Sequence, residues 1–424
     1  MRASPDERRA RGKALREALP RSSLGAWAPS ARDAIAILSR AVVGRDPSRV
    51  ELRWSRMAES PLACFRGAIT LFATDVMREP TAGVEVQLCG DAHLFNLGAY
   101  AAPDGHLVFD LNDFDHACRG PFEWDLRRLA ASVVLAGREA GQREGACRDA
   151  VSSMVASYRE AIDRYAEMRV LDVARTEISP RDRHRPLAPI FERAARDTPA
   201  RLLRKATASS PEGTARFRED PPYLVPLPSL DLLGSSWSSY RDSLGAGRQQ
   251  VLDAYTPVEI ASRAQGIDSL GLASWIVLAF GNGDRDPLFL QLKEIGACAW
   301  GRERDVHGGR RAAEGQARTQ TVSDPFLGWT SVDGVPCLVR QWSDHKGRCT
   351  VEMLGGRALG EYAALCGQVL AKAHARTGDA AILAGYVGSG DNVDRALASF
   401  AVAYADQATA DHAALIAAIR AGTV

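Results

Sequence analysis

The sequence predicts an α+β protein with two lobes, in which a small antiparallel β-rich lobe is inserted after a helical one. Apolar residues recur at three- and four-residue spacing near both ends of the chain, as in amphipathic helices. Short β-type segments separated by glycine turns are concentrated between residues 255 and 342. Apolar residues make up 46% and charged residues 25% of the chain, which is the composition of a globular protein.

Four segments follow from this pattern. Residues 1–60 form a polar, helical N-terminal extension, and residues 61–250 form a helical part that starts at Pro61 and carries two acidic loops. Residues 251–345 form the small β-rich part, with "SWIVLAF", "PLFLQLKEI" and "GVPCLVRQW" as strands. Residues 346–424 form C-terminal helices that complete the helical lobe. The helical lobe is therefore expected to come from both ends of the chain.

Charge and targeting signals argue against several classes of partner. The chain has 53 basic and 52 acidic residues, a formal net charge of +1, so it lacks the basic surplus of a nucleic-acid-binding protein. The N-terminal segment is charged throughout, and no run approaches the ~18 apolar residues of a membrane span. The eight cysteines are scattered without a C-x-x-C pair. We expect a cytoplasmic protein with reduced thiols and with neither a membrane nor a nucleic-acid partner.

The strongest chemical signal is "LCGDAHLFN", followed by "LNDFD". Asp91 and Asn96 stand at the spacing with which a phosphotransferase loop supplies a base for the attacking hydroxyl and an amide oxygen for Mg²⁺. Asp113, at the end of a strand-like run, is placed to bind the same metal, because Mg²⁺ prefers hard oxygen ligands. Asp115 is either a further metal ligand or a group that supports the ligands. The simpler alternative is a turn in which Asp and Asn bond to local backbone.

The segments "CGDAHLFN" and "NDFDHACRGPFEWDL" resemble the core of the aminoglycoside phosphotransferase and choline kinase branch of the protein-kinase-like superfamily. The resemblance implies a bilobed protein-kinase-like fold that uses ATP and Mg²⁺. It makes Asp91 the catalytic base and Asn96 and Asp113 the metal ligands. Asp125 is then a brace for the helix that follows. One position departs from the family pattern, since Cys89 stands where a histidine, mainly a structural brace, usually precedes Gly-Asp.

Nearly the whole chain also resembles a bacterial family known as domain of unknown function 2252. The shared segments are "RMAESPLACFRG", "CGDAHLFNLGAY", "FDLNDFDHACRGPFEWDLRRLAAS", "SDPFLGW", "VRQWSDHKG", "LAKAHARTGD" and "YADQ". That family label implies no activity, so the expected function rests on the residues themselves.

A nucleotide-binding part is expected in the β-rich segment. A G-x-x-x-x-G-K-[ST] loop is absent, because "GIDSLGLA" has the glycines without the Lys-Ser pair. In protein kinases a glycine-rich turn joins two strands, and the phosphate-binding lysine lies on the third. The stretch from Gly266–Gly271 to Lys293 has this layout, and "VPCLVRQW" would lead to an adenine-binding hinge. The residues expected to bind nucleotide are Gly266, Ser269, Gly271, Lys293, Glu314, Arg340 and Gln341.

Lys293 is unusual because the chain has only five lysines and relies on arginine for the rest of its positive charge. Strand alternation puts Gln291 and Lys293 on the face opposite to the neighbouring leucines. A compact ammonium group fits between phosphates and a carboxylate. We expect Lys293 on a middle strand, facing Asp113 across a cleft. Its carboxylate partner is expected to be Glu314 or Glu294. The alternative is a lysine whose head reaches solvent from a strand end.

The order of these parts differs from that of an ordinary kinase. The acidic loops lie about 200 residues before Lys293, whereas the nucleotide-binding lobe of a kinase comes first. A circular permutation explains the difference. The helix that precedes the catalytic loop in the related phosphotransferases ends in "LA-x-x-HA", and here "VLAKAHA" follows the hinge strand. Joining residue 380 to the strand before Gly90 restores the usual order. The helix near Leu62–Met77 is the other candidate for that place.

The leading interpretation is an ATP- and Mg²⁺-dependent phosphotransferase that acts on a hydroxyl group of a small molecule, with transfer of AMP instead of phosphate as a variant. The Arg-rich stretch 175–218 and the N-terminal helices are candidates for the acceptor site. A second interpretation is a metal-dependent hydrolase with a two-metal centre. Its ligands would be Asp91, His93, Asp113, Asp115 and His116. A third is a pseudoenzyme that binds nucleotide as a regulatory module.

Overall fold

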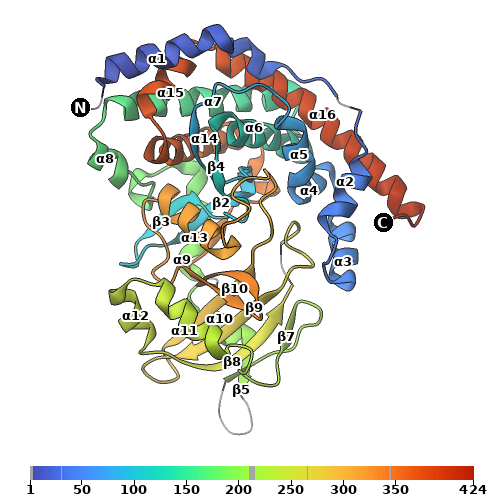
Figure 1. Cartoon of the computed structure of the whole chain (residues 1–424), viewed down its shortest axis with the longest axis vertical. Coiled ribbons are helices and arrows are strands. Elements are labelled where there is room, and N and C mark those ends of the chain that lie inside the picture. The colour runs from blue at the N-terminus through green and yellow to red at the C-terminus, as the bar shows by residue number, and fades with distance from the viewer. Residues whose placement is uncertain (1–2, 30, 210–214, 265, 343–344) are drawn as a thin grey trace.

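The computed structural model describes residues 3–29, 31–209, 215–264, 266–342 and 345–424. It is a mixture of helices and antiparallel strands, as predicted for an α+β protein. Long helices fill one end of the molecule, and an antiparallel sheet fills the other (Figure 1). The first and last helices both lie at the helical end, so that end is built from both ends of the chain.

The described residues form helices of very different length. Several begin at caps that the sequence provides: Ser4 and Glu7 make a capping box at α1, and Ser60 caps α4 just before Pro61. No helix within the described ranges is both long and apolar enough to cross a bilayer. The α-helices are α1 Pro5–Ala18, α2 Ala34–Ala41, α3 Pro47–Met57, α4 Pro61–Gly67, α5 Ile69–Val76, α6 Phe122–Glu139, α7 Glu144–Glu167, α8 Val170–Arg175, α9 Ala188–Arg196, α10 Pro199–Ala206, α11 Gly234–Ser243, α12 Ala246–Leu252, α13 Gly308–Thr319, α14 Ala358–Thr377, α15 Ala380–Val387 and α16 Asn392–Arg420.

The helical body is built around α6, α7, α14 and α16. Residues 122–137 of α6 are all buried, so this helix lies at the centre of the body. Tyr158 of α7 hydrogen-bonds to His374 of α14, with 2.9 Å between the hydroxyl oxygen and Nδ1. The ring of Tyr158 also stacks on Phe122 at the start of α6. These contacts fix the last turns of α14 against the centre of the body.

The strands form one large sheet and three small ones within the described residues. The large sheet is antiparallel throughout, in the order β11-β12-β10-β9-β8-β7, so β10 has a neighbour on each side. The small sheets are β1-β4, β13-β2-β3 and β5-β6. The strands are β1 Glu85–Leu88, β2 Leu97–Ala101, β3 Leu107–Leu111, β4 Cys118–Pro121, β5 Thr207–Ser209, β6 Ala215–Phe217, β7 Leu224–Pro226, β8 Thr256–Arg263, β9 Ser274–Phe280, β10 Pro287–Glu294, β11 Gly328–Val332, β12 Val335–Gln341 and β13 Gly347–Arg348.

Alternation along β10 separates its side chains in the way that the sequence predicts. The leucines of β10 belong to one apolar cluster and Phe289 to another. Gln291 and Lys293 share the Phe289 face, because successive side chains of a strand point to opposite sides. The register with β12 sets Gln291 opposite Arg340. Helix α13 packs against β11 and β12 and connects β10 to them along the chain.

The last turn of α14 lies beside β1. The Gln87 N–H donates to Thr377 Oγ1 at 3.1 Å, and Arg119 Nη1 of β4 donates to the Thr377 carbonyl oxygen at 2.7 Å. Gly378 approaches β1 so closely that an added Cβ would lie 2.7 Å from Val86 Cγ1. The end of α14 and the start of β1 therefore meet, although 290 residues separate Gln87 from Thr377.

Candidate functional site

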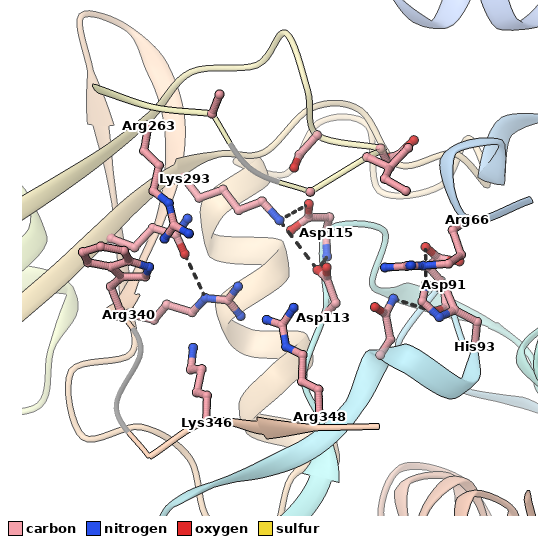
Figure 2. Close-up of a pocket in the computed structure, with 18 of the residues that line it drawn as sticks. Arg66, Asp91, His93, Asp113, Asp115, Arg263, Lys293, Arg340, Lys346 and Arg348 are labelled. Atoms are coloured by element: carbon pink, nitrogen blue, oxygen red, sulfur yellow. Dashed lines mark hydrogen bonds and ion pairs between the residues drawn. The ribbon is translucent and has the colours of Figure 1, made fainter. Parts of the chain in front are cut away.

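A cavity of about 630 Å³ lies between the large sheet and the helical body (Figure 2). The loops after β1 and β3 supply acidic side chains, and the glycine turn between β8 and β9 borders it. The described lining includes five carboxylates, two histidines and eight cationic side chains, a set that suits a multiply charged ligand. These charged and histidine residues are Asp91, Asp113, Asp115, Asp197, Asp268, His93, His116, Arg56, Arg66, Arg193, Arg263, Lys293, Arg340, Lys346 and Arg348.

The backbone of the first acidic loop is held from α6. Asp125 accepts hydrogen bonds from the N–H groups of Cys89 and Gly90 at 2.8 and 3.1 Å. Gly90 has a φ of +85°, and a Cβ there would lie 2.0 Å from the His116 carbonyl oxygen, so a side chain cannot be accommodated. The family resemblance implies a brace for the following helix, whereas Asp125 here braces the loop itself. The loop is thereby fixed before any ligand arrives.

Asp91 lies on the cavity wall, with 8% of its surface exposed. The fully buried Arg128 of α6 donates from Nε to Asp91 Oδ1 at 2.8 Å, and His93 Nε2 lies 3.8 Å from Oδ2. Burial raises the pKa of Asp91 to about 6, although the charge of Arg128 opposes the rise. Asp91 is therefore an anion at neutral pH that takes up a proton readily, as a general base requires.

Asn96 and Asp113 offer oxygen atoms suited to a divalent cation. The Asn96 amide nitrogen donates to the Asp91 carbonyl oxygen at 2.9 Å, which leaves the amide oxygen as the acceptor of that side chain. Burial opposes ionisation of Asp113, but the charges of Lys293 and Arg340 outweigh it and hold its pKa well below the usual value. One amide oxygen and one carboxylate, completed by phosphate oxygens, fit Mg²⁺. The described residues contain no group of three or more His, Cys, Asp or Glu side chains gathered around one metal position.

Lys293 lies on a middle strand and faces the second acidic loop. Its Nζ is 2.5 Å from Asp115 Oδ2 and 3.8 Å from Asp113 Oδ1 (Figure 2). Burial on its own lowers the pKa of Lys293, but the two carboxylates outweigh burial and raise it. Burial and the charge of Asp113 raise the pKa of Asp115. The lysine therefore stays charged and holds together two carboxylates that repel one another.

The structure corrects the expected carboxylate partner of Lys293, which is neither Glu314 nor Glu294. Glu314 bridges Arg310 and Arg318 of its own helix at 2.6 and 2.7 Å, because residues four apart on a helix are neighbours. Glu294 follows Lys293 on the strand and so points to the other face. Its Oε2 accepts a backbone N–H from the segment before β9 at 2.6 Å. The partner is a carboxylate of the acidic loop instead.

The other residues expected to bind nucleotide are divided between the cavity and its surroundings. Gly266, Ser269 and Arg340 line the cavity. Gly271 lies outside its lining, at the edge of α3, where its carbonyl oxygen accepts a backbone N–H at 3.1 Å. Gln341 lines a smaller neighbouring pocket. The structure therefore places Gly271 and Gln341 beside the cavity.

Asp268, in the glycine turn, is a lining residue that sequence reasoning missed. Its Oδ2 is 2.9 Å from His116 Nε2, and its Oδ1 is 3.0 Å from Arg53 Nη2. Arg53 also donates to a carbonyl oxygen of this turn, and so do Arg45 and Arg56. Arg49 donates to a carbonyl oxygen just after the turn. The sequence signal for this contact is the helical spacing of these arginines, at positions 45, 49, 53 and 56.

The arrangement gives the hydrolase interpretation no support. His116 is paired with Asp268, and Asp115 with Lys293. His93 Nδ1 accepts a backbone N–H from its own loop at 3.2 Å. Three of the five side chains that the two-metal centre would use therefore have other partners.

Several arginines of the lining were also missed. Arg66 of α4 lies at the Asp91 end of the cavity (Figure 2). Arg263, Arg340 and Arg348 lie on the far side of Asp113 from there (Figure 2). Of these, the sequence singled out Arg340 alone. In a chain so rich in arginine, no single one stands out by composition.

The fold and the cavity define an α+β protein with a strongly charged site between a sheet and a helical body. The chain belongs to a bacterial family, because the model described as "Uncharacterized protein conserved in bacteria (DUF2252)" matches residues 45–418. No curated protein and no solved structure matches it. The matched region contains all the described lining residues of the cavity.

Proposed function

We propose that this protein is a kinase-like phosphotransferase that uses ATP and Mg²⁺ to transfer a phosphorus-containing group to a hydroxyl of a small molecule. The observation that carries the proposal is the convergence of Asp91, Asn96, Asp113 and Lys293 on one cavity. They supply a base, two metal ligands and a cation for the phosphates, which are the parts that phosphoryl transfer needs. Lys293 lies on the large sheet, about 200 residues along the chain from the acidic loops that it contacts.

The order of elements supports a kinase-like, circularly permuted fold. The glycine turn joins β8 to β9, Lys293 lies on the next strand, and α13 precedes β11 and β12. This order agrees with the one expected of a kinase-like small lobe, in which the lysine lies on the third strand. The end of α14 meets β1 at Thr377 and Gln87. Joining the end of α14 to β1 would give the order that is usual in kinases: the sheet, the hinge, the helix that carries "VLAKAHA" and then the catalytic loop.

Each residue has a distinct role in this proposal. Asp91 accepts the proton of the acceptor hydroxyl, and Arg128 holds the carboxylate in place. Asn96 and Asp113 would hold Mg²⁺, which supplies positive charge that neutralises the phosphates during transfer. Lys293, fixed by its contact with the acidic loop, orients the phosphates.

Nucleotide turnover tests the proposal. The full-length protein is incubated with ATP, Mg²⁺ and a panel of small alcohols that includes aminoglycosides and choline, and nucleotides are separated by chromatography. We expect acceptor-dependent consumption of ATP that requires Mg²⁺. Absence of consumption together with absence of Mg²⁺-dependent ATP binding by calorimetry contradicts the proposal.

Asp113→Asn should abolish the Mg²⁺-dependent part of ATP binding, because it removes a charge from the metal position without changing the shape of the side chain. Thermal unfolding with ATP, with and without Mg²⁺, measures this. The wild-type protein should gain a higher Tm with Mg²⁺, and the variant should not. Asp305→Asn, at an exposed position, is the matched control. Unchanged Mg²⁺ dependence in Asp113→Asn would move the metal position elsewhere.

Activity should fall as the pH drops below about 6. The pKa of Asp91 is raised to about 6, so the base is ionised and active above this pH and protonated below it. Because kcat/KM reports the free enzyme, it should decrease about tenfold per pH unit on the acid side. A pH–rate profile measured where the protein stays folded checks this. A profile that is flat through pH 6 excludes Asp91 as the base.

A further inference from the structure

The end of the cavity next to the end of β12 is strongly cationic. Arg263, Arg340 and Arg348, which we call the arginine cluster, reach it from three strands (Figure 2). Arg340 donates to neutral groups, the Asn112 carbonyl oxygen at 2.9 Å and Gln291 Oε1 at 3.4 Å. Arg263 Nη1 is buried without a hydrogen-bond partner. Among the residues that the structure describes, no carboxylate forms an ion pair with any member of the cluster.

The guanidinium groups of the cluster repel one another. Loss of solvation and the charges of Arg348 and Arg340 lower the pKa of Arg263 to about 10. Loss of solvation and the charge of Arg340 lower the pKa of Arg348, and the carboxylate that opposes this is Asp113. Asp113 already faces Lys293. Guanidinium groups that lie close together, with no ion-paired carboxylate among the described residues, favour a polyanionic ligand such as a chain of phosphates.

A nucleotide bound as in a protein kinase would place its base at this end, which requires a mainly apolar slot. The lining there is polar instead. Gln291, two residues before Lys293 on the same face, is 1% exposed and lies opposite Arg340. Trp342 is covered by Arg263, with 4.3 Å between the guanidinium carbon and the ring centroid. Phosphates fit this end of the cavity better than a base does.

We propose that ATP binds in the reverse orientation, with its β- and γ-phosphates in the arginine cluster and its α-phosphate beside Lys293 and Asp113. The group transferred is then AMP and not the γ-phosphoryl group. The inference rests on the function proposed above and decides which part of the nucleotide reaches the acceptor. The adenosine lies toward Ile267, which is in the glycine turn, and the aromatic ring of Tyr223, both of which line the cavity.

The reaction balances with ATP and the acceptor alone. The acceptor oxygen forms a bond to the α-phosphorus, and the bond from that phosphorus to the bridging oxygen of the pyrophosphate breaks. The electron pair leaves with the pyrophosphate, whose charge the arginine cluster stabilises. The proton of the acceptor hydroxyl passes to Asp91. The products are the AMP ester of the acceptor and pyrophosphate.

Product analysis separates the two orientations. The full-length protein is incubated with Mg²⁺, the acceptor panel and ATP labelled at either the α- or the γ-phosphorus, with water as the default acceptor. Pyrophosphate together with AMP, or an acceptor labelled from the α position only, supports the reverse orientation. ADP, or an acceptor labelled from the γ position, overturns it and leaves the proposed function intact. Absence of both turnover and Mg²⁺-dependent ATP binding contradicts the proposed function itself.

Binding of inorganic tripolyphosphate decides the orientation even without turnover. Calorimetry with Mg²⁺ should show binding to the wild-type protein and an affinity about tenfold or more lower in Arg340→Met and Arg348→Met. Arg348 donates no hydrogen bond to a described residue, so its replacement removes no native bond. Arg169→Met is the matched control, because that side chain is 87% exposed. Wild-type affinity in both cluster variants, or no tripolyphosphate binding to a wild-type protein that binds ATP, overturns the inference.

Discussion

Replacing Asp91 by Asn is expected to slow group transfer by about 10²- to 10⁴-fold, the range for loss of a general base. Binding of ATP with Mg²⁺ should persist, because in the proposed function Asp91 faces the acceptor hydroxyl while Asn96 and Asp113 hold the metal. Steady-state kinetics and a thermal shift with ATP and Mg²⁺ on the same preparation measure both properties. The combination of lost transfer and retained binding is specific for a base that does not touch the nucleotide.

The free energy of unfolding of Asp91→Asn has to be measured together with its activity, because the substitution also affects the fully buried Arg128, which donates to Asp91. Removing one partner of a buried ion pair costs about 3–5 kcal/mol. The cost should be smaller here, since the Asn amide oxygen still accepts the hydrogen bond from Arg128. Asp149→Asn, at an exposed position, is the control for the loss of charge alone. Full activity in Asp91→Asn would make the loop motif a structural turn, and lost ATP binding would make Asp91 a metal ligand.

Lys293→Met is expected to weaken ATP binding by about tenfold or more and to reduce turnover further, because it removes the charged contact to the phosphates that we propose for Lys293. It also leaves Asp113 and Asp115 without the cation that separates their charges. Calorimetry with ATP and Mg²⁺ gives the affinity, and thermal unfolding gives the cost in stability. The effect on binding distinguishes this variant from Asp91→Asn.

Two further variants serve as controls for Lys293→Met. Lys293→Arg should restore little activity, since a planar guanidinium does not fit the place of a compact ammonium between the two carboxylates. Lys205→Met changes an exposed lysine on α10 and should behave as the wild-type protein. Unchanged affinity for ATP in Lys293→Met would show that the lysine only joins the sheet to the acidic loop.

Local patterns were sufficient to predict the α+β class and the strand that carries Lys293. The alternation of "LFLQLK" fixes which side chains share a face of β10, and the structure has Gln291 on the Lys293 face. The expected approach of Lys293 to Asp113 also holds, at 3.8 Å. The face of β10 follows from the strand period, which is a property of a short segment, whereas the approach of Lys293 to Asp113 was expected from the kinase-like layout that the resemblance implies.

Other contacts of the site were not predicted from the sequence. Glu314 was expected to pair with Lys293, but it pairs instead with the arginines four residues before and after it on its own helix. Asp268 reaches His116 across 152 residues of sequence, and no local pattern marks that pair. The arginine cluster likewise forms only when β8, β12 and β13 come together. The arginine cluster, which we propose orients the nucleotide, is therefore visible only in the folded chain.

A crystal structure of the full-length protein with Mg²⁺ and a non-hydrolysable ATP analogue tests the central claim most directly. The account predicts that the analogue occupies the cavity between the sheet and the helical body. Asn96 and Asp113 should bind the metal, Lys293 Nζ should contact a phosphate, and the Asp91 carboxylate should remain open to the acceptor. An analogue bound outside this cavity, or inside it with neither Asp113 on the metal nor Lys293 on a phosphate, would contradict the account.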